Sequence, residues 1–390
     1  MSPLTIVALT LSQRRRLLME YRRFGRSEFK ISVLSCGTMR ALDSQDGMTE
    51  TIDVALTSGV NHLETASGYG HSERFLGNSL HALNPPRDAY FLTTKIGPTP
   101  DAASFETTLI ACFEKLQVDR MDCLALHGVN TSEHLTWINN PTGCMAVVRD
   151  WVAAGKINHV GFSTHGSLDL IQAAIATDYF DFINLHYGLF FRRNEPALTH
   201  ATDRDMGIFI ISPGDKGGLL YTPPPKLEDL CTPLTPLAAN YRFLLGDPRI
   251  HTLSVGPANP QEWEQPLDSI TPVPGESQVF DRLDRVQTET LGLEQCSQCY
   301  ECLPCPEEIN IPEVLRLRNL SVAYDMKAFG EYRYGMFEKA GHWFPGNKGN
   351  RCTDCGDCLP RCPENLDIPT LLRDTHNSLA GKARRRLWDT

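Results

Sequence analysis

The chain has 390 residues, of which 41% are hydrophobic and 22% are charged. These proportions are those of an ordinary globular protein and exclude wholesale disorder, a collagen-like fibre and a continuous coiled coil. The net charge of −10, from 37 Lys and Arg against 47 Asp and Glu, argues against a general nucleic-acid binder, because a phosphate backbone requires a basic surface.

The amino-terminal segment carries neither a membrane span nor a good signal peptide. Its apolar stretch, Pro3 to Leu11, is far shorter than the about 20 residues that cross a bilayer. Arginines follow this stretch at positions 14–16, whereas a signal peptide has its basic residues first. We expect residues 1–18 to be an extension before a domain that begins near Met19, in a cytoplasmic protein with no membrane partner.

Eight short, mainly apolar runs recur over the first 270 residues, with helical stretches between them. They are Ile31 to Cys36, His62 to Ala66, Tyr90 to Ile96, Met121 to His127, His159 to Thr164, Phe182 to Tyr187, Gly207 to Ser212 and Thr252 to Val255. Eight strand and helix alternations over about 250 residues fit a (β/α)8 barrel better than an open doubly wound sheet. One predicted helix, Ser104 to Leu116, has Ser104 as its N-cap and Leu109, Phe113 and Leu116 on one face.

In such a barrel the carboxyl ends of the strands carry the active site. Polar side chains lie at these ends of consecutive predicted strands: Glu64 and Tyr69, Lys95, His127, then Ser163, Thr164 and His165, and Asn184 with Tyr187. A solvated strand end or a structural histidine would explain any one of them. Their joint placement favours a catalytic site.

These residue types suit carbonyl reduction. Hydride delivered to a carbonyl carbon builds negative charge on the oxygen, which then needs a proton donor. A tyrosine, with a pKa of about 10, is too weak an acid unless its phenolate is stabilised. Lys95 close to Tyr69 would stabilise it, Glu64 would hold and tune the lysine, and His127 would orient the carbonyl oxygen.

The runs Leu63 to Glu73, Thr93 to Lys95, Leu126-His127 and Gly161 to Ser163 resemble the aldo/keto reductase family over residues 19 to about 270. The resemblance implies a TIM barrel that binds a nicotinamide cofactor without a Rossmann fold, and an Asp/Tyr/Lys/His tetrad that reduces a small carbonyl substrate. Tyr69, Lys95 and His127 would fill three of these roles. Glu64 stands where the family has aspartate, one methylene longer, which puts the geometry of the ion pair in question.

The resemblance also implies the cofactor contacts. Ser163 and Asn184 would bind the nicotinamide carboxamide and Tyr187 would stack on the ring, although an ordinary polar layer would place the same residues there. The other predicted contacts follow three strands: Gly37, Thr38 and Met39; Ser212, Pro213, Lys216, Gly218 and Leu219 in a pyrophosphate loop; and Gly256 and Asn259 at a phosphate-binding turn. NADP(H) is the family's expectation, but the usual basic residue is missing, so NAD against NADP stays open.

Eight of the 13 cysteines fall in two short runs near the carboxyl end. The second run, Cys352, Cys355, Cys358 and Cys362 followed by proline, is the bacterial ferredoxin spacing C-x2-C-x2-C-x3-C-P. The first run, Cys296, Cys299, Cys302 and Cys305, is one residue shorter before its last cysteine. Similar tails, Ile309 to Pro312 and Leu366 to Pro369, follow the two runs, so the segment resembles an internal duplication.

Two [4Fe–4S] clusters fit this pattern better than zinc or disulfides. Zinc ribbons use pairs of Cys-x2-Cys, and the chain has no evident secretory signal. By the ferredoxin resemblance, the cysteine before proline serves the other cluster. Cys296, Cys299 and Cys302 would then bind one cluster with Cys362, and Cys352, Cys355 and Cys358 would bind the other with Cys305.

The sequence therefore predicts an extension (1–18), an aldo/keto reductase barrel (19–280), a small α-rich ferredoxin-like domain (281–375) and a basic tail (376–390). The leading hypothesis is an NAD(P)H-dependent oxidoreductase coupled to electron transfer through the clusters, with ferredoxin or another electron carrier as a partner. Nicotinamide transfers electrons as a hydride pair and a cluster takes one, so direct exchange would need a converter such as flavin. Alternatives are a carbonyl reductase with structural or redox-sensing clusters, and a non-catalytic barrel that docks an electron carrier.

Overall fold

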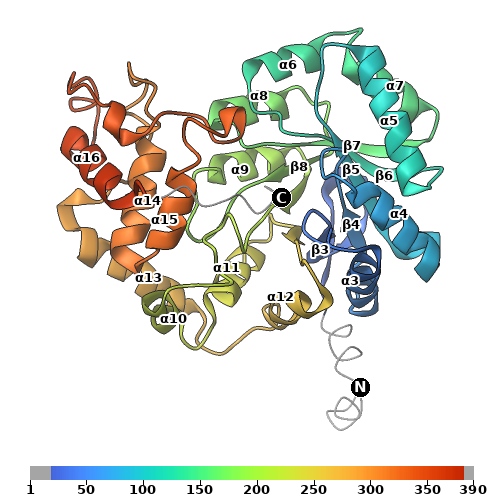
Figure 1. Ribbon diagram of the computed structural model, residues 1–390, viewed down its shortest axis with the longest axis horizontal. Coiled ribbons are helices and arrows are strands. Elements are labelled where there is room, and N and C mark those ends of the chain that lie inside the picture. The colour runs from blue at the N-terminus through green and yellow to red at the C-terminus, as the bar shows by residue number, and fades with distance from the viewer. Residues whose placement is uncertain (1–18, 382–390) are drawn as a thin grey trace. The chain divides into compact units, whose positions relative to one another are not determined.

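The structure, a computed structural model, describes residues 19–381 (Figure 1). Contacts along the backbone divide the chain into one unit of Met1–Gly217 with Asn240–Pro272 and a second of Gly218–Ala239 with Val273–Thr390. The predicted boundary between residues 280 and 281 falls inside helix α13 (Ser277–Leu291). The predicted extension lies outside the described residues. Helix α16 (Ile368–Leu379) includes residues 376–379 of the predicted tail, and the last part of the tail, from residue 382, lies outside the described residues.

The first unit contains the predicted barrel. Eight parallel strands close on themselves in the order β10-β3-β4-β5-β6-β7-β8-β9. The strands are β3 (Leu34–Gly37), β4 (His62–Glu64), β5 (Phe91–Ile96), β6 (Met121–Leu126), β7 (Ile157–Ser163), β8 (Phe182–Leu185), β9 (Gly207–Ile210) and β10 (Thr252–Val255). Each overlaps one of the eight predicted runs, so the predicted (β/α)8 architecture is confirmed.

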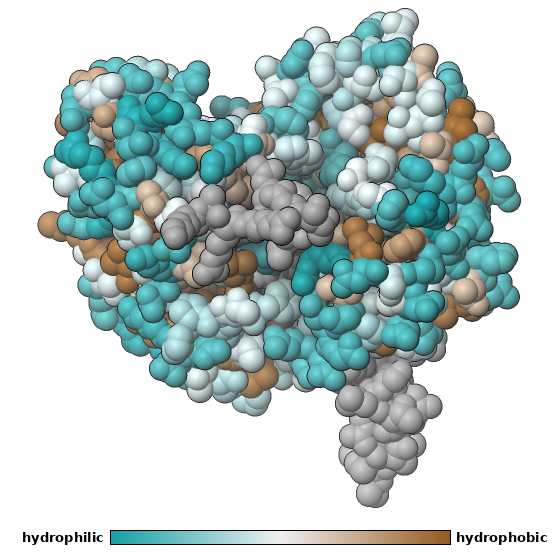
Figure 2. All heavy atoms as spheres, viewed as in Figure 1, coloured by the Kyte–Doolittle hydropathy of each residue, from teal (hydrophilic) through white to brown (hydrophobic). Residues whose placement is uncertain are grey.

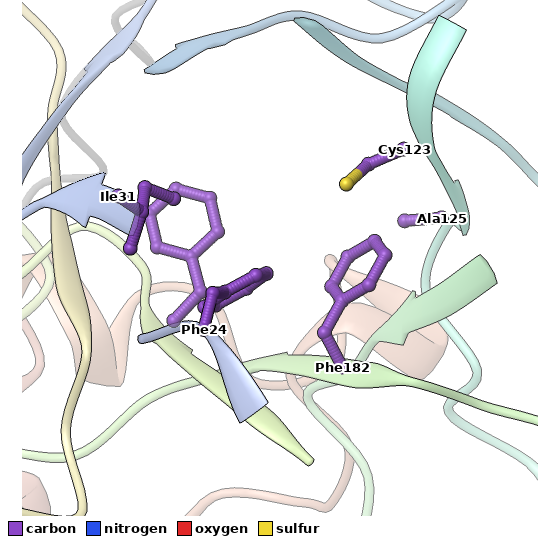
Figure 3. Close-up of a cluster of buried hydrophobic side chains, with 6 residues drawn as sticks. Phe24, Ile31, Cys123, Ala125 and Phe182 are labelled. Atoms are coloured by element: carbon purple, nitrogen blue, oxygen red, sulfur yellow. The ribbon is translucent and has the colours of Figure 1, made fainter. Parts of the chain in front are cut away.

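The first predicted strand is wrong in one respect, because it forms two separate elements. Its beginning is β2 (Lys30–Ser32), which pairs antiparallel with β1 (Tyr21–Arg23), and only its end is barrel strand β3. The hairpin contributes Phe24 and Ile31 to a buried cluster with Cys123, Phe182 and other barrel residues (Figure 3). Apolar side chains therefore close the barrel interior on the side of this hairpin.

Helices accompany the strands around the barrel (Figure 1). They are α3 (Gln45–Thr57), α4 (Ser72–Leu83), α5 (Ala102–Leu116), α6 (Ser132–Asn139), α7 (Cys144–Ala153), α8 (Leu168–Ala176), α9 (Glu195–Asp203), α11 (Pro236–Leu245) and α12 (Glu264–Asp268). The predicted Ser104 cap is wrong: Asp101 caps α5 by accepting the N–H groups of Ala103 and Ser104 at 3.2 Å. The cap lies earlier because Asp101 places a carboxylate before the first turn, where it satisfies two backbone donors.

A polar layer lies inside the barrel around His62. Its Nδ1 is 2.7 Å from the hydroxyl of Ser35, and its Nε2 is 2.7 Å from that of Thr93. Burial, aided by the positive charge of Lys95, lowers the pKa of His62 to about 3. The imidazole is therefore neutral in the folded protein, and both ring nitrogens have partners.

This neutral histidine makes stability depend on pH. Between pH 6.5 and about 3 the unfolded chain binds a proton on His62 that the folded chain excludes, so the free energy of unfolding falls as the pH falls, by up to ~1.4 kcal/mol per pH unit. We expect His62→Gln to show a shallower loss of stability than the wild type from pH 7 to 4.5, measured as the urea midpoint at each pH. Parallel profiles would contradict this.

The second unit is helical, with α10 (Pro225–Cys231), α13, α14 (Ile311–Tyr324), α15 (Lys327–Tyr334) and α16. The predicted duplication is visible in it, because α14 and α16 each follow one cysteine run and begin alike. Asn310 caps α14 and Asp367 caps α16, each by accepting a backbone N–H at 3.4 Å, and each helix has proline in its first turn.

The surface is mixed in character. On the face shown in Figure 2, hydrophilic residues predominate and apolar ones are scattered among them. No helix within residues 19–381 is long and apolar enough to cross a membrane.

Candidate functional site

The four predicted catalytic residues converge at the carboxyl ends of neighbouring strands. Glu64 is the last residue of β4, Lys95 is the last but one of β5, and His127 directly follows β6. Lys95 Nζ lies 2.6 Å from Glu64 Oε2 and donates to the carbonyl of Thr65 at 2.9 Å. Lys95 Nζ lies over the ring of Tyr69, 4.9 Å from its centroid, and this ring meets that of His127 edge-on with centroids 5.5 Å apart.

The protonation states of Lys95, Tyr69 and His127 suit a site in which Tyr69 donates a proton. Burial favours a lower pKa for Lys95, but its interactions with Glu64 and Tyr69 together outweigh burial, so the pKa is raised and the ammonium is retained. Burial raises the pKa of Tyr69 more than Lys95 lowers it, so the phenol keeps its proton at neutral pH. Burial, with Lys95 and Lys216, lowers the pKa of His127 to about 3, which leaves a neutral imidazole.

Glu64 is seated by contacts that the sequence analysis did not anticipate. Ser254 donates to Oε1 at 3.3 Å, and Asn184 Nδ2 donates to Oε2 at 3.4 Å. A Cβ on Gly37 would lie 2.8 Å from Ser254 Oγ and 3.3 Å from Glu64 Oε1, so glycine leaves the space that the longer carboxylate uses. Ser254 could have been found from its position in the last strand, two residues after the inward-facing Thr252.

Thr38, which follows β3, contacts the backbone of the predicted catalytic residue Glu64. Thr38 donates its hydroxyl to the carbonyl of Glu64 at 3.0 Å and lies 2.6 Å from the hydroxyl of Ser72. Thr38 is buried and Met39 is half-buried. Thr38 thus fixes the backbone at Glu64, and the predicted cofactor contacts of Gly37, Thr38 and Met39 remain predictions.

The predicted nicotinamide residues include an unpartnered buried acceptor. Asn184 is fully buried, and its Oδ1 has no hydrogen-bond partner among the described residues. A buried acceptor left unpaired costs about 1–3 kcal/mol, so a ligand N–H such as that of a carboxamide fits here. Ser163 lies on the adjacent strand and accepts the N–H of Gly128 at 2.9 Å. Tyr187 is buried with its ring centroid 5.9 Å from that of Phe243.

The predicted pyrophosphate loop after β9 is a tight turn. The backbone of Ser212 has a φ of 49°, and a Cβ on Gly217 would lie 2.0 Å from the carbonyl oxygen of Pro213. Pro213 also accepts a hydrogen bond from Asn240 at 2.9 Å, and Lys216 contributes the charge felt by His127. Gly218 and Leu219 belong to the second unit.

The predicted phosphate turn after β10 is occupied by an internal carboxylate. Asn259 caps a short 3-10 helix (Pro260–Trp263) by accepting the N–H of Glu262 at 3.2 Å. Glu262 in turn accepts the N–H of Ala258 at 3.0 Å and pairs with Arg40 at 2.7 Å, while Arg40 also donates to the carbonyl of Gly256 at 2.9 Å. Sequence analysis missed both charged residues, because their meeting depends on the fold.

The eight predicted metal ligands surround two hollows in the second unit. Cys296, Cys299, Cys302 and Cys362 line the first, and Cys305, Cys352, Cys355 and Cys358 line the second. Within residues 19–381, no three His, Cys, Asp or Glu side chains converge closely enough to hold a single ion. Each hollow, ringed by four cysteines, has the donor set that a [4Fe–4S] cluster requires.

Comparison with known proteins agrees with this division into a barrel and a cysteine-rich part. The model of the aldo/keto reductase family matches residues 33–230, and that of a 4Fe-4S dicluster domain matches residues 295–366. The chain belongs to the aldo/keto reductase family and carries a carboxyl-terminal 4Fe–4S domain. It is an oxidoreductase of this family, so the predicted family and enzyme class are confirmed.

Individual relatives are distant. L-galactose dehydrogenase of Arabidopsis thaliana is 29% identical over 28% of this chain, and aldo-keto reductase str7 of Strobilurus tenacellus is 27% identical over 50%. The chain spans 38% and 57% of the lengths of these two proteins. The holo form of aldo-keto reductase AKR11C1 from Bacillus halodurans shares the fold, with a TM-score of 0.59 and 19% identity over 68% of this chain and 96% of that one.

Proposed function

We propose that the barrel transfers hydride between NAD(P)(H) and a small carbonyl substrate. The observation that carries this proposal is the cluster of the buried Glu64 and Lys95 with the half-buried Tyr69, beside the unpartnered Oδ1 of Asn184. A proton donor and a carboxamide acceptor are the two groups that such a reaction needs next to each other.

Each residue has one task in this proposal. The nicotinamide, when bound, supplies or accepts the hydride. Tyr69 gives its proton to the carbonyl oxygen, and Lys95 stabilises the phenolate that remains. Glu64 keeps Lys95 charged, while the neutral His127 donates an N–H that orients the carbonyl. Asn184 and Ser163 hold the carboxamide.

We propose that the barrel prefers NADP(H) as its dinucleotide, and that Glu262 weakens the binding of this cofactor. A carboxylate beside Arg40 competes with a phosphate for the same guanidinium and N–H groups. We expect Glu262→Gln to raise NADPH affinity several-fold and to leave NADH affinity nearly unchanged, measured by fluorescence titration. Equal changes for both cofactors would show that this turn does not face the 2′-phosphate.

We further propose that the two cysteine sets bind two [4Fe–4S] clusters. Protein purified without oxygen is expected to hold about eight iron and eight acid-labile sulfide per chain. Metal analysis and sulfide release measure both numbers. Stoichiometric zinc without sulfide would contradict the assignment.

Electron transfer between the barrel and the clusters, with ferredoxin or a similar carrier as the outside partner, is the finer part of the proposal. The experiment mixes anaerobic protein with NADPH and follows the visible absorbance of the clusters, with and without added flavin. Bleaching in either arm supports coupling. Aldehyde reduction without bleaching in either arm would instead favour a carbonyl reductase whose clusters are structural or redox-sensing.

A further inference from the structure

The two cysteine hollows correspond residue by residue. Every residue that lines the first hollow has a counterpart lining the second, displaced along the chain by 56 or 57 residues. The fourth cysteines cross, because Cys305 follows the first run and lines the second hollow, whereas Cys362 does the reverse. The duplication therefore makes two nearly equal sites, and any difference between them comes from the few positions that break the correspondence.

The acidic residues that line the hollows and the cysteine exposures do not break the correspondence. Asp354, whose counterpart is Gln298, does break it, but it lines neither hollow and pairs with Arg373. Glu364 lines the first hollow and its counterpart Glu307 lines the second. Cys302 and Cys358 are each 7% exposed, and Cys299 and Cys355 are both exposed. The residues that line the two hollows would therefore present similar negative charge to the two clusters, and their cysteines would have similar access to water.

Arg361 has no counterpart. It is the extra residue that lengthens the second run, and it lines the second hollow. Its Nε donates to the carbonyl of Asp357 at 2.8 Å and its Nη2 to that of Pro304 at 2.9 Å. Because these partners are neutral carbonyls, they fix the guanidinium without cancelling its charge.

A second difference acts in the same direction. The first hollow is lined by Tyr300 where the second has Gly356. A ring beside a cluster replaces water that would otherwise solvate added charge, and desolvation disfavours the more highly charged state. The potential of an iron–sulfur cluster depends on net charge and solvent exposure nearby.

We propose that Arg361 makes the two clusters unequal, so that the cluster held by Cys305, Cys352, Cys355 and Cys358 is reduced first. A cluster with four thiolate ligands is anionic, and one added electron increases its negative charge with no bond formed or broken. A fixed guanidinium stabilises that reduced state. This inference rests on the proposed clusters, and iron and sulfide contents test that premise separately.

The experiment is a potentiometric titration of the anaerobic full chain with dithionite, followed by electron paramagnetic resonance. Arg361→Gln should lower the higher of the two potentials by about 59 mV, which is a tenfold change in the one-electron equilibrium constant. It should leave the lower potential nearly unchanged. Arg361→Lys, which keeps the charge, should retain most of the separation. Arg351→Gln is the matched control, because Arg351 pairs with Glu338 at 3.0 Å and lines neither hollow.

Two outcomes would overturn the proposal when the iron content is complete. One is an Arg361→Gln variant whose potentials equal those of the wild type. The other is a shift of the lower potential in place of the higher one. Glu307→Gln and Glu364→Gln supply an independent check, since each should raise one potential, the first the higher and the second the lower. Metal analysis before each titration would detect loss of iron in a variant. If Arg361→Gln loses iron, the potentials of Arg361→Lys are compared with those of the wild type instead.

Discussion

Replacing Tyr69 with phenylalanine is expected to lower the carbonyl-reduction rate by about 100-fold or more, with little change in NADPH affinity. The hydroxyl is lost from the group whose proton the substrate oxygen takes up, whereas the ring stays against His127. Steady-state kinetics with small aldehydes and a separate NADPH titration measure the two effects. Tyr90→Phe is the matched control, because Tyr90 is a tyrosine at the amino end of β5, whereas the catalytic cluster lies at the carboxyl ends of the strands.

The wild-type rate should also show where Tyr69 titrates. An acid donates only below its pKa, and burial raises the pKa of Tyr69, so the alkaline decline of kcat should lie above pH 10. Tyr69→Phe should lose this decline. A rate unaffected by the substitution would show that another group protonates the product.

The second large effect concerns Glu64. Glu64→Gln removes the anion 2.6 Å from Lys95 and leaves a buried ammonium without its countercharge, so the reduction rate should fall by ~100-fold. Glu64→Asp keeps the charge but retracts it by one methylene from Lys95, Ser254 and Asn184, and a displacement of this kind in a catalytic array also lowers the rate, though here less than loss of the charge. We expect the order wild type, then aspartate, then glutamine, with aspartate about 10-fold slower than wild type.

The same two variants, assayed with a panel of aldehydes, distinguish the possible roles of the longer carboxylate. An aspartate variant faster than the wild type would mean that Glu64 sits in an aspartate's site and hinders reduction. An aspartate variant slower than the glutamine variant would mean that the site serves a different reaction. Melting temperatures of both variants separate a catalytic loss from a loss of folded protein.

The sequence was sufficient to predict the barrel, because each strand is a short buried run and each run has helical spacing after it. It was also sufficient to place Glu64, Tyr69, Lys95 and His127 in one site, since parallel strands of a barrel bring their carboxyl ends together. Three cysteines of each hollow were predicted from their short spacing, and the fourth was assigned from the ferredoxin resemblance, in which the cysteine before proline serves the other cluster.

What the sequence did not predict depends on contacts across the fold. Ser254 and Glu64 are 190 residues apart and Arg40 and Glu262 are 222 apart, and no local pattern joins such pairs. The split of the first strand was missed because Val33 continues the apolar run while the backbone changes partners from β1 to the barrel. The role of Arg361 became apparent only when the two hollows could be compared residue by residue.

Asn184 joins two parts of the site, since its amide group donates to Glu64 while its carbonyl oxygen stays available to a ligand. Two equilibria that share a group influence each other by the same factor in both directions. If a bound carboxamide changes how firmly the Glu64, Lys95 and Tyr69 cluster holds its protons, then the protonation of that cluster changes cofactor affinity equally. The affinity for the nicotinamide cofactor, measured without any turnover, would then depend on whether the Glu64, Lys95 and Tyr69 cluster carries its catalytic proton.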